Sequence, residues 1–189
     1  SHLAAAHLQE HTFACPAGGQ LLVTPRGARV LGLFPDAAGE NTYFVNPELL
    51  DAAHAKPYLA GEHVLGGDRV WIAPERGLFF RGDQLADGVT TQASIDPGAW
   101  RIAALSARSI RFVNDFTATF FRIPGSVVRG RVERSIRAIP SPFAHFPDAV
   151  GGLKDCAFAG YEVASRFELL ESPEDPLYFG LWFLIQLVV

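Results

Sequence analysis

The chain is poor in residue types that mark several common protein classes. Its 189 residues contain no methionine, only two cysteines and 19% charged side chains. Cys15 and Cys156 lie far apart and neither belongs to a CxxC motif, which excludes a structural zinc site and a disulfide framework. We expect two buried free thiols, although the two cysteines could instead pair with each other.

Basic side chains form no cluster along the chain, and the net charge is −4. The sequence therefore lacks the basic patch that is typical of nucleic-acid-binding proteins. The apolar run over Leu177–Val189 is too short to cross a membrane as a helix. We expect neither nucleic acid nor a membrane as a partner. The first residues, SHLAAAHLQEH, lack the features of a signal peptide, so the compartment is cytoplasmic or, if a signal peptide was removed, periplasmic or secreted.

Common catalytic and cofactor-binding motifs are also missing. The sequence contains no GxSxG, GxxxxGK[ST], HExxH or GxGxxG pattern. Of the six histidines, His7 and His11 have a spacing that suits a metal on one helix face, and we interpret them as surface residues. We therefore expect no cofactor and no metal.

The pattern of apolar residues predicts the fold class. With 49% apolar residues, including 15 phenylalanines, the chain can bury the core of one domain spanning residues 1–189. Apolar and polar residues alternate with the period of strands. We predict strands over residues 20–24, 28–34, 42–45, 69–73, 78–81, 109–113, 116–123, 127–139 and 160–170. A hairpin turn at Asn114-Asp115 and one short helix over His2–His11 complete a predicted all-β antiparallel sandwich.

The predicted strand over residues 127–139 shows the alternation best. Val128, Val132 and Ile136 lie on one face, and charged side chains lie on the other. Arg134 falls on the apolar face. A buried arginine needs a partner, so Arg134 either forms an internal ion pair or faces a binding groove.

The C-terminal run, LYFGLWFLIQLVV, is apolar on both faces of a strand. This pattern predicts a central strand buried on both sides. Such a strand rarely ends a protein, so we expect the chain to be the N-terminal part of a larger sandwich. A missing C-terminal half, or a second copy in a homo-oligomer, would then cover the strand over Leu181–Val189.

The stretch HVLGGDRVWIAPE at residues 63–75 holds several groups that suit a polyhydroxy ligand. It combines a Gly-Gly turn, an acid–base pair, a tryptophan and a carboxylate that follows a proline. Successive strand residues point to opposite faces. Arg69 and Trp71 therefore share one face, and Asp68 lies on the other.

The element GGDRVWIAPE resembles part of the galactose-mutarotase-like superfamily, particularly its uncharacterised bacterial branch. Further similar segments follow the family's order: GARVLGLF at 27–34, NTYFVNP at 41–47, TQASIDP at 91–97, VERSI at 132–136 and GLWFLIQL at 180–187. The resemblance implies a supersandwich of large antiparallel sheets. It also implies that a carbohydrate binds in a groove on one concave sheet.

The resemblance further implies a chemistry, that of an aldose 1-epimerase-like isomerase. A base removes the proton of the anomeric hydroxyl and an acid protonates the ring oxygen, so the sugar ring opens and closes again. This sequence lacks the HHxYFN-type element that supplies the histidine in aldose epimerases. The candidates for the acid and the base are His63 and Glu75, with a structural histidine and an exposed turn carboxylate as the alternatives.

The candidate substrate-binding residues are Arg69, Trp71, Asp68, Asn46 and Arg134. Arg69 could clamp sugar hydroxyls or a carboxylate, or it could pair with Asp68 or Glu75. Trp71 could stack on a pyranose ring or belong to the core. Asn46 could orient a hydroxyl or serve a turn.

Two functions follow from these interpretations. The first is a carbohydrate-binding protein of the mutarotase-like fold, related to sugar epimerases, whose partner is a small-molecule carbohydrate. The alternative is a non-catalytic sugar-binding or protein-interaction domain on the same scaffold. A histidine and a carboxylate that face each other across a groove would favour the enzyme.

Overall fold

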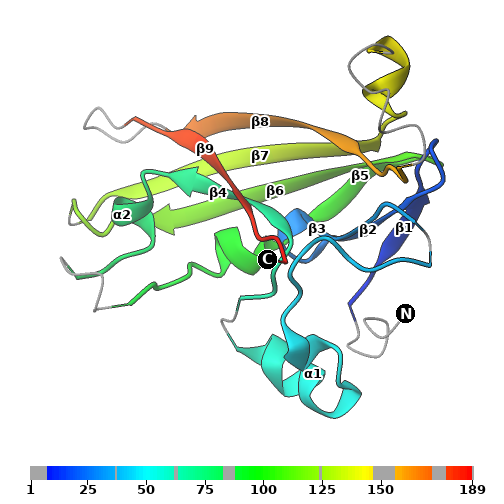
Figure 1. Cartoon of the computed structure of the whole chain (residues 1–189). Coiled ribbons are helices and arrows are strands. Elements are labelled where there is room, and N and C mark those ends of the chain that lie inside the picture. The colour runs from blue at the N-terminus through cyan, green and yellow to red at the C-terminus, as the bar shows by residue number, and fades with distance from the viewer. Residues whose placement is uncertain are drawn as a thin grey trace.

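The computed structural model describes residues 8–36, 38–61, 64–82, 88–123, 125–146, 156–171 and 178–188. Two antiparallel sheets form its framework (Figure 1). The five-stranded sheet has the order β1 (His11–Ala14), β2 (Gln20–Thr24), β3 (Arg29–Phe34), β4 (Asp68–Ala73) and β9 (Gly180–Ile185). The four-stranded sheet has the order β5 (Arg101–Leu105), β6 (Ser109–Thr119), β7 (Val127–Ala138) and β8 (Tyr161–Glu171). The predicted all-β sandwich is thus confirmed.

Short helical segments connect the strands. They are η2 (Arg26–Ala28), η3 (Pro47–Leu49), α1 (Ala52–Ala60), α2 (Glu75–Leu78), η5 (Ser94–Gly98) and η6 (Pro142–His145). The side chain of Asp51 caps α1 by accepting a hydrogen bond from the backbone N–H of Ala53. Together with η3, this helix covers apolar residues on the outer face of the five-stranded sheet, Leu22 and Leu31 among them.

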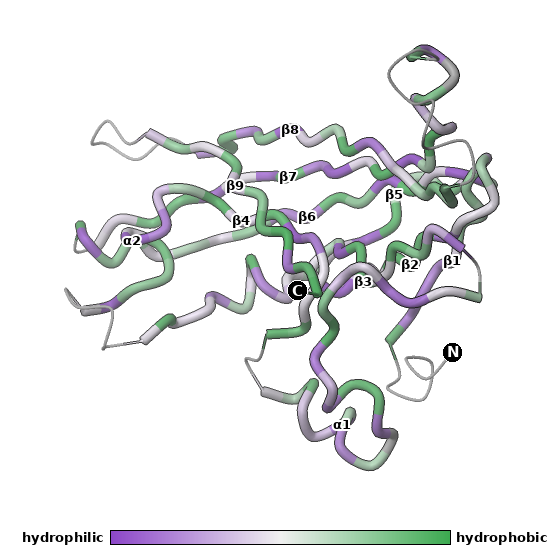
Figure 2. The backbone as a smooth tube through the Cα atoms, viewed as in Figure 1, coloured by the Kyte–Doolittle hydropathy of each residue, from purple (hydrophilic) through white to green (hydrophobic). Residues whose placement is uncertain are grey.

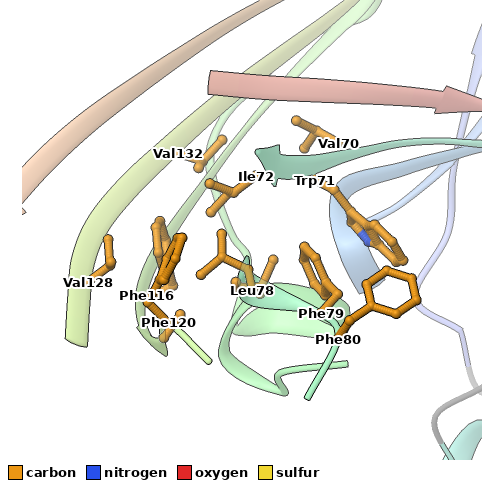
Figure 3. Packing of buried hydrophobic residues seen from close by; sticks show 12 residues of the cluster. Val70, Trp71, Ile72, Leu78, Phe79, Phe80, Phe116, Phe120, Val128 and Val132 are labelled. Carbon is orange, nitrogen blue, oxygen red and sulfur yellow. The ribbon is translucent and has the colours of Figure 1, made fainter. Parts of the chain in front are cut away.

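The core fills the space between the two sheets. One half joins Val23 and Val30 to Phe112 and Ile136. The other half joins β4 to β6 and β7 and includes Leu78, Phe79 and Phe80, as Figure 3 shows. Along β7 and much of β8, apolar and polar residues alternate, which is visible as changing colours in Figure 2, whereas β9 is almost entirely apolar. On β7 the inward positions Val128, Val132, Arg134 and Ile136 are buried, as the alternation predicts.

Five of the predicted strands correspond to β2, β3, β4, β7 and β8. The predicted hairpin turn at Asn114-Asp115 is wrong, because β6 runs unbroken through both residues. Asn114 is buried, and its side chain bonds the backbone of Ser94 and Ala99. A polar residue inside the strand is thus satisfied by another segment, and no turn is needed.

Two further predicted strands are also wrong. Residues 78–81 complete α2 and a short irregular segment, where three consecutive apolar side chains are buried from Leu78 to Phe80. Residues 42–45 contribute isolated bridges only, from Tyr43 to Leu187 and from Val45 to Gly66. A continuous apolar run has no period, so it cannot distinguish a strand from a buried turn.

Predictions at the two ends of the chain fare differently. Residues 1–7 of the predicted N-terminal helix lie outside the described residues, while residues 8–10 are irregular and His11 begins β1. At the other end, β9 is an edge strand, and Phe183 and Ile185 are 45% and 56% exposed. The prediction of a central strand buried on both sides is therefore wrong.

Two remaining expectations concern the cysteines and the membrane. Cys15 is a buried free thiol, but Cys156 is an exposed one, so the expectation that both are buried is half right. Among the described residues, no helix is long and apolar enough to cross a membrane.

Candidate functional site

Strand β4 sends the predicted site residues to opposite faces of its sheet. Asp68 points inward to the four-stranded sheet, where it meets Arg134. Arg69 and Trp71 point outward, where both meet Asp96. The two-residue period of a strand predicted this separation. The predicted site residues of β4 therefore belong to two buried polar groups, one on each face of the sheet.

The outward group, here called the Asp96 cluster, consists of Arg29, Arg69, Trp71 and Asp96. Arg29 donates two hydrogen bonds from Nη2 to Asp96, 2.9 Å to Oδ1 and 2.8 Å to Oδ2. Trp71 Nε1 donates at 2.9 Å and Arg69 Nη1 at 3.3 Å, both to Oδ2. One carboxylate thus receives hydrogen bonds from three side chains.

The electrostatics of the cluster follow from burial. Burial alone would raise the pKa of Asp96, but the charge of Arg29, the hydrogen bond from Trp71 and the charge of Arg69 outweigh it and hold this pKa below its usual range. Burial, together with the neighbouring charge of Arg29, lowers the pKa of Arg69 to about 10. Burial also lowers the pKa of Arg26, which lies near the same carboxylate. Asp96 and Arg69 are therefore both charged at neutral pH.

Positive charge is in excess at this place. Arg29 and Arg69 bond Asp96, and Arg26 lies near it; since the charge of Glu75 also acts on Arg69, three guanidinium groups stand against two carboxylates. Among the described residues, the Nε atoms of all three arginines are buried without a hydrogen-bond partner. Buried donors and unbalanced charge both cost free energy unless something satisfies them.

A cavity of about 170 Å³ opens beside the cluster. Its polar wall consists of Arg26, Arg69, Asp96 and Thr91, and its apolar wall includes Leu65 and Val89. Pockets for drug-sized molecules occupy about 300–1,000 Å³. The cavity therefore fits one small molecule or one sugar unit.

Trp71 lines this cavity but has no free ring face. The Arg69 guanidinium carbon lies 4.0 Å from the ring centroid of Trp71, and the ring of Phe79 stacks on it at 4.3 Å. Two groups this close to one ring must occupy its two faces. Figure 3 shows Phe79 beside the indole. Trp71 thus supports Arg69 and Asp96, and the predicted stacking on a pyranose has no open surface.

The segment η5, which carries Asp96, is held against strand β6 of the four-stranded sheet. The Asn114 side chain on β6 donates to Ser94 O at 2.8 Å and accepts from the Ala99 backbone N–H at 3.1 Å. Gln92, just before η5, also bonds the backbone of Thr119 at the end of β6. These contacts hold the loop against β6 and direct Asp96 toward Arg29 and Arg69.

The Gly-Gly turn of the sequence element shapes the backbone beside the cluster. Gly66 and Gly67 both have positive φ, at 99° and 74°. A Cβ atom at Gly66 would lie 2.1 Å from Phe44 O, and one at Gly67 would lie 2.1 Å from Val30 O. Only glycine allows this close approach of strands. The Gly66 carbonyl in turn accepts a hydrogen bond from Arg29 Nη1 at 3.2 Å.

The inward group, here called the Asp68 group, consists of Asp68, Arg134, Tyr161 and Tyr43. Asp68 Oδ2 accepts from Arg134 Nη2 at 2.7 Å and from the Tyr161 hydroxyl at 2.7 Å. The Tyr43 hydroxyl lies 2.6 Å from that of Tyr161. Of the two alternatives predicted for Arg134, the internal ion pair is the one formed.

The other predicted residues lie apart from both groups. Asn46 caps η3 and donates to the Tyr58 hydroxyl at 2.7 Å, so it serves a turn. Glu75 begins α2, is half-buried and does not line the cavity, although its charge acts on Arg69. His63 lies outside the described residues.

Asp96, Arg29 and Arg26 were missed as site residues. Asp96 falls within TQASIDP and Arg29 within GARVLGLF, two segments that carry the family resemblance. The sequence signal for Asp96 was an Asp that follows an apolar residue and precedes a proline. Its arginine partners could not be assigned without the fold.

No group of three or more potential metal ligands occurs among the described residues. No protein-family model, curated protein or solved structure matches the chain. The resemblance to the galactose-mutarotase-like superfamily therefore stays a prediction.

Proposed function

We propose that this chain binds a small anionic carbohydrate, such as a sugar acid, in the cavity beside the Asp96 cluster. The observation that carries the proposal is the excess of three guanidinium groups over the two carboxylates that act on them, Asp96 and Glu75. A ligand carboxylate would balance that charge and accept from the unpaired Nε atoms of Arg26 and Arg69.

The remaining walls fit the rest of such a molecule. Thr91 and Asp96 offer partners for ligand hydroxyls, and Leu65 and Val89 can contact the apolar edge of a sugar ring. The volume of about 170 Å³ suits one monosaccharide unit. The mutarotase-like scaffold belongs to the same proposal, and the two antiparallel sheets are in keeping with it.

The geometry favours binding over ring opening. None of the described residues that line the cavity is a histidine. Asp96 is kept ionised by Arg29, Trp71 and Arg69, so it cannot donate a proton to a ring oxygen at neutral pH. Epimerisation would therefore need a proton donor beyond this cluster.

Isothermal titration with glucuronate, glucose and glucosamine tests the proposal. We expect glucuronate to bind, and glucose and glucosamine to bind at least about tenfold more weakly, because a charge-assisted hydrogen bond contributes about 1.5–3 kcal/mol. Arg26→Gln should weaken glucuronate binding by a similar factor. The matched control is Arg111→Gln, which changes an exposed arginine on β6.

Equal affinity for glucose and glucuronate would contradict the proposal, and so would equal losses in the two variants. Binding of none of the three sugars would also contradict it.

A further inference from the structure

A second cleft lies on the opposite face of β4, between β8 and β9. It encloses about 450 Å³ and shares no lining residue with the cavity beside Asp96. Its walls are apolar, formed by Leu33, Val163, Phe183 and Ile185. Its polar side consists of Tyr43, Asp68 and Tyr161. Figure 1 shows the two strands, β8 and β9, that border it.

The protons on the polar side of the cleft can be assigned. Tyr161 donates its hydroxyl proton to Asp68 Oδ2, so the 2.6 Å contact between the tyrosines must use the proton of Tyr43. Burial raises the pKa of both tyrosines, and the charge of Asp68 raises that of Tyr161 further. Both phenol protons are therefore committed within the group, and the oxygens that remain are acceptors.

One acceptor stands out because it is both buried and unused. Asp68 is 3% exposed, and its Oδ1 has no hydrogen-bond partner among the described residues. Nε and Nη1 of Arg134 are likewise buried without a partner there. The guanidinium of Arg134 lies 5.8 Å from the ring centroid of Phe183, which is a wall of the cleft. Asp68 lines the cleft, so its unpaired oxygen borders a volume that a ligand could fill.

The net charge selects the ligand class. Asp68 and Arg134 cancel, and the tyrosines are neutral, so the group is neutral overall. A cationic ligand would meet Arg134, and an anionic ligand would meet Asp68. A polyol would leave most of its hydroxyls against apolar walls without partners.

We propose that this cleft binds a neutral, mostly apolar molecule through a single hydroxyl group, which donates its proton to Oδ1 of Asp68. The apolar body lies against Val163, Phe183 and Ile185. The site is independent of the sugar-acid cavity, because the two lie on opposite faces of β4.

Two-dimensional ¹H–¹⁵N NMR with small probes tests this proposal. The probes are 2-phenylethanol, its methyl ether, phenethylamine and phenylacetate. We expect 2-phenylethanol to shift the amide signals of β8 and β9. The other three should bind at least about tenfold more weakly, since each lacks the donor or carries a charge.

A substitution that fills the cleft with a larger side chain tests the site further. Val163→Trp should abolish the shifts, because the larger side chain occupies the cleft without changing the Asp68 group. Leu170→Trp, on the same strand but outside the cleft and 45% exposed, should leave them unchanged. If Val163→Trp does not fold, Ile185→Trp gives the same test from a rim residue that is 56% exposed.

Three results would overturn the proposal. Equal binding of the alcohol and its methyl ether would show apolar adsorption without the Asp68 hydrogen bond. Tighter binding of the amine would show a cation site. A dimer in solution that Val163→Trp dissociates would show that a second copy of the chain covers the cleft.

Discussion

Two buried carboxylates, Asp68 on β4 and Asp96 on η5, lie on opposite faces of β4, and their surroundings differ in charge. Asp96 pairs with Arg29 and Arg69 and lies near Arg26, and the cluster carries net positive charge. Asp68 meets Arg134 and two tyrosines, and that group is neutral. The two groups lie back to back across β4.

The difference shows how charge balance separates two kinds of site. A neutral, internally bonded group can complete a core without a ligand, provided that its hydrogen bonds are satisfied. A group with excess charge is stabilised further by a counter-ion. Changing one residue at a time in each group tests this comparison.

The largest expected effect is from Asp96→Ala. This change leaves Arg29 and Arg69 buried without their carboxylate, and breaking a buried pair costs about 3–5 kcal/mol of the free energy of unfolding. Urea denaturation measures it. Asp115→Ala, which removes an exposed carboxylate on β6, is the control and should change the urea midpoint little. A loss for Asp96→Ala no larger than that of the control would refute the buried cluster.

The next effect distinguishes the neutral group from the charged one. Arg134→Leu should cost about 3 kcal/mol, because Asp68 is left buried without its counter-ion. Adding Asp68→Asn should restore most of this loss, since the amide oxygen still accepts from Tyr161. The same double-mutant cycle with Asp96→Asn and Arg69→Leu should recover much less, because Arg29 and Arg26 remain. Similar recovery of the free energy of unfolding in the two cycles would contradict the proposed difference in charge between the two groups.

A smaller effect is expected from pH. The pKa of Asp96 is lower in the folded chain than the unfolded value of about 3.9. In the window below that value, the unfolded chain binds more protons than the folded one, so the free energy of unfolding falls as pH falls. This contribution is complete above the unfolded pKa and is lost through the folded pKa. Urea midpoints of the wild type and Asp96→Asn should therefore converge in acid, and parallel curves would contradict the assignment.

The smallest expected effect is on the exposed face. Glu162 pairs with Arg137 at 2.8 Å, and the two side chains are 52% and 58% exposed. Solvent screens such a pair. Glu162→Gln should leave the urea midpoint unchanged within error. A clear shift would show that this surface is less accessible to solvent than the described residues indicate.

Local patterns predicted those parts of the molecule that depend on neighbouring residues alone. Alternation located β7 and its inward Arg134, and parity placed Arg69 and Trp71 together and Asp68 opposite. These features follow from the two-residue period of a strand.

The partners could not be predicted in the same way. Asp96 lies 27 residues beyond Arg69, and packing against β6 brings them together. Asn114-Asp115 has the composition of a hairpin turn, but the side chain of Asn114 bonds a distant loop and β6 runs through both residues unbroken. Choices between local and long-range hydrogen bonds are decided by the whole fold.

The attachment of η5 to β6 links the two sheets at the cavity beside the Asp96 cluster. The carboxylate that receives hydrogen bonds from Arg29 and Arg69 of one sheet is carried by a loop that Asn114 holds to the other sheet. A molecule bound there joins the two layers of the sandwich, so separating them requires its release. At a concentration one hundred times its Kd, a ligand adds about 2.7 kcal/mol to the unfolding free energy. That increment would appear as slower amide hydrogen exchange along β6 as well as beside the ligand.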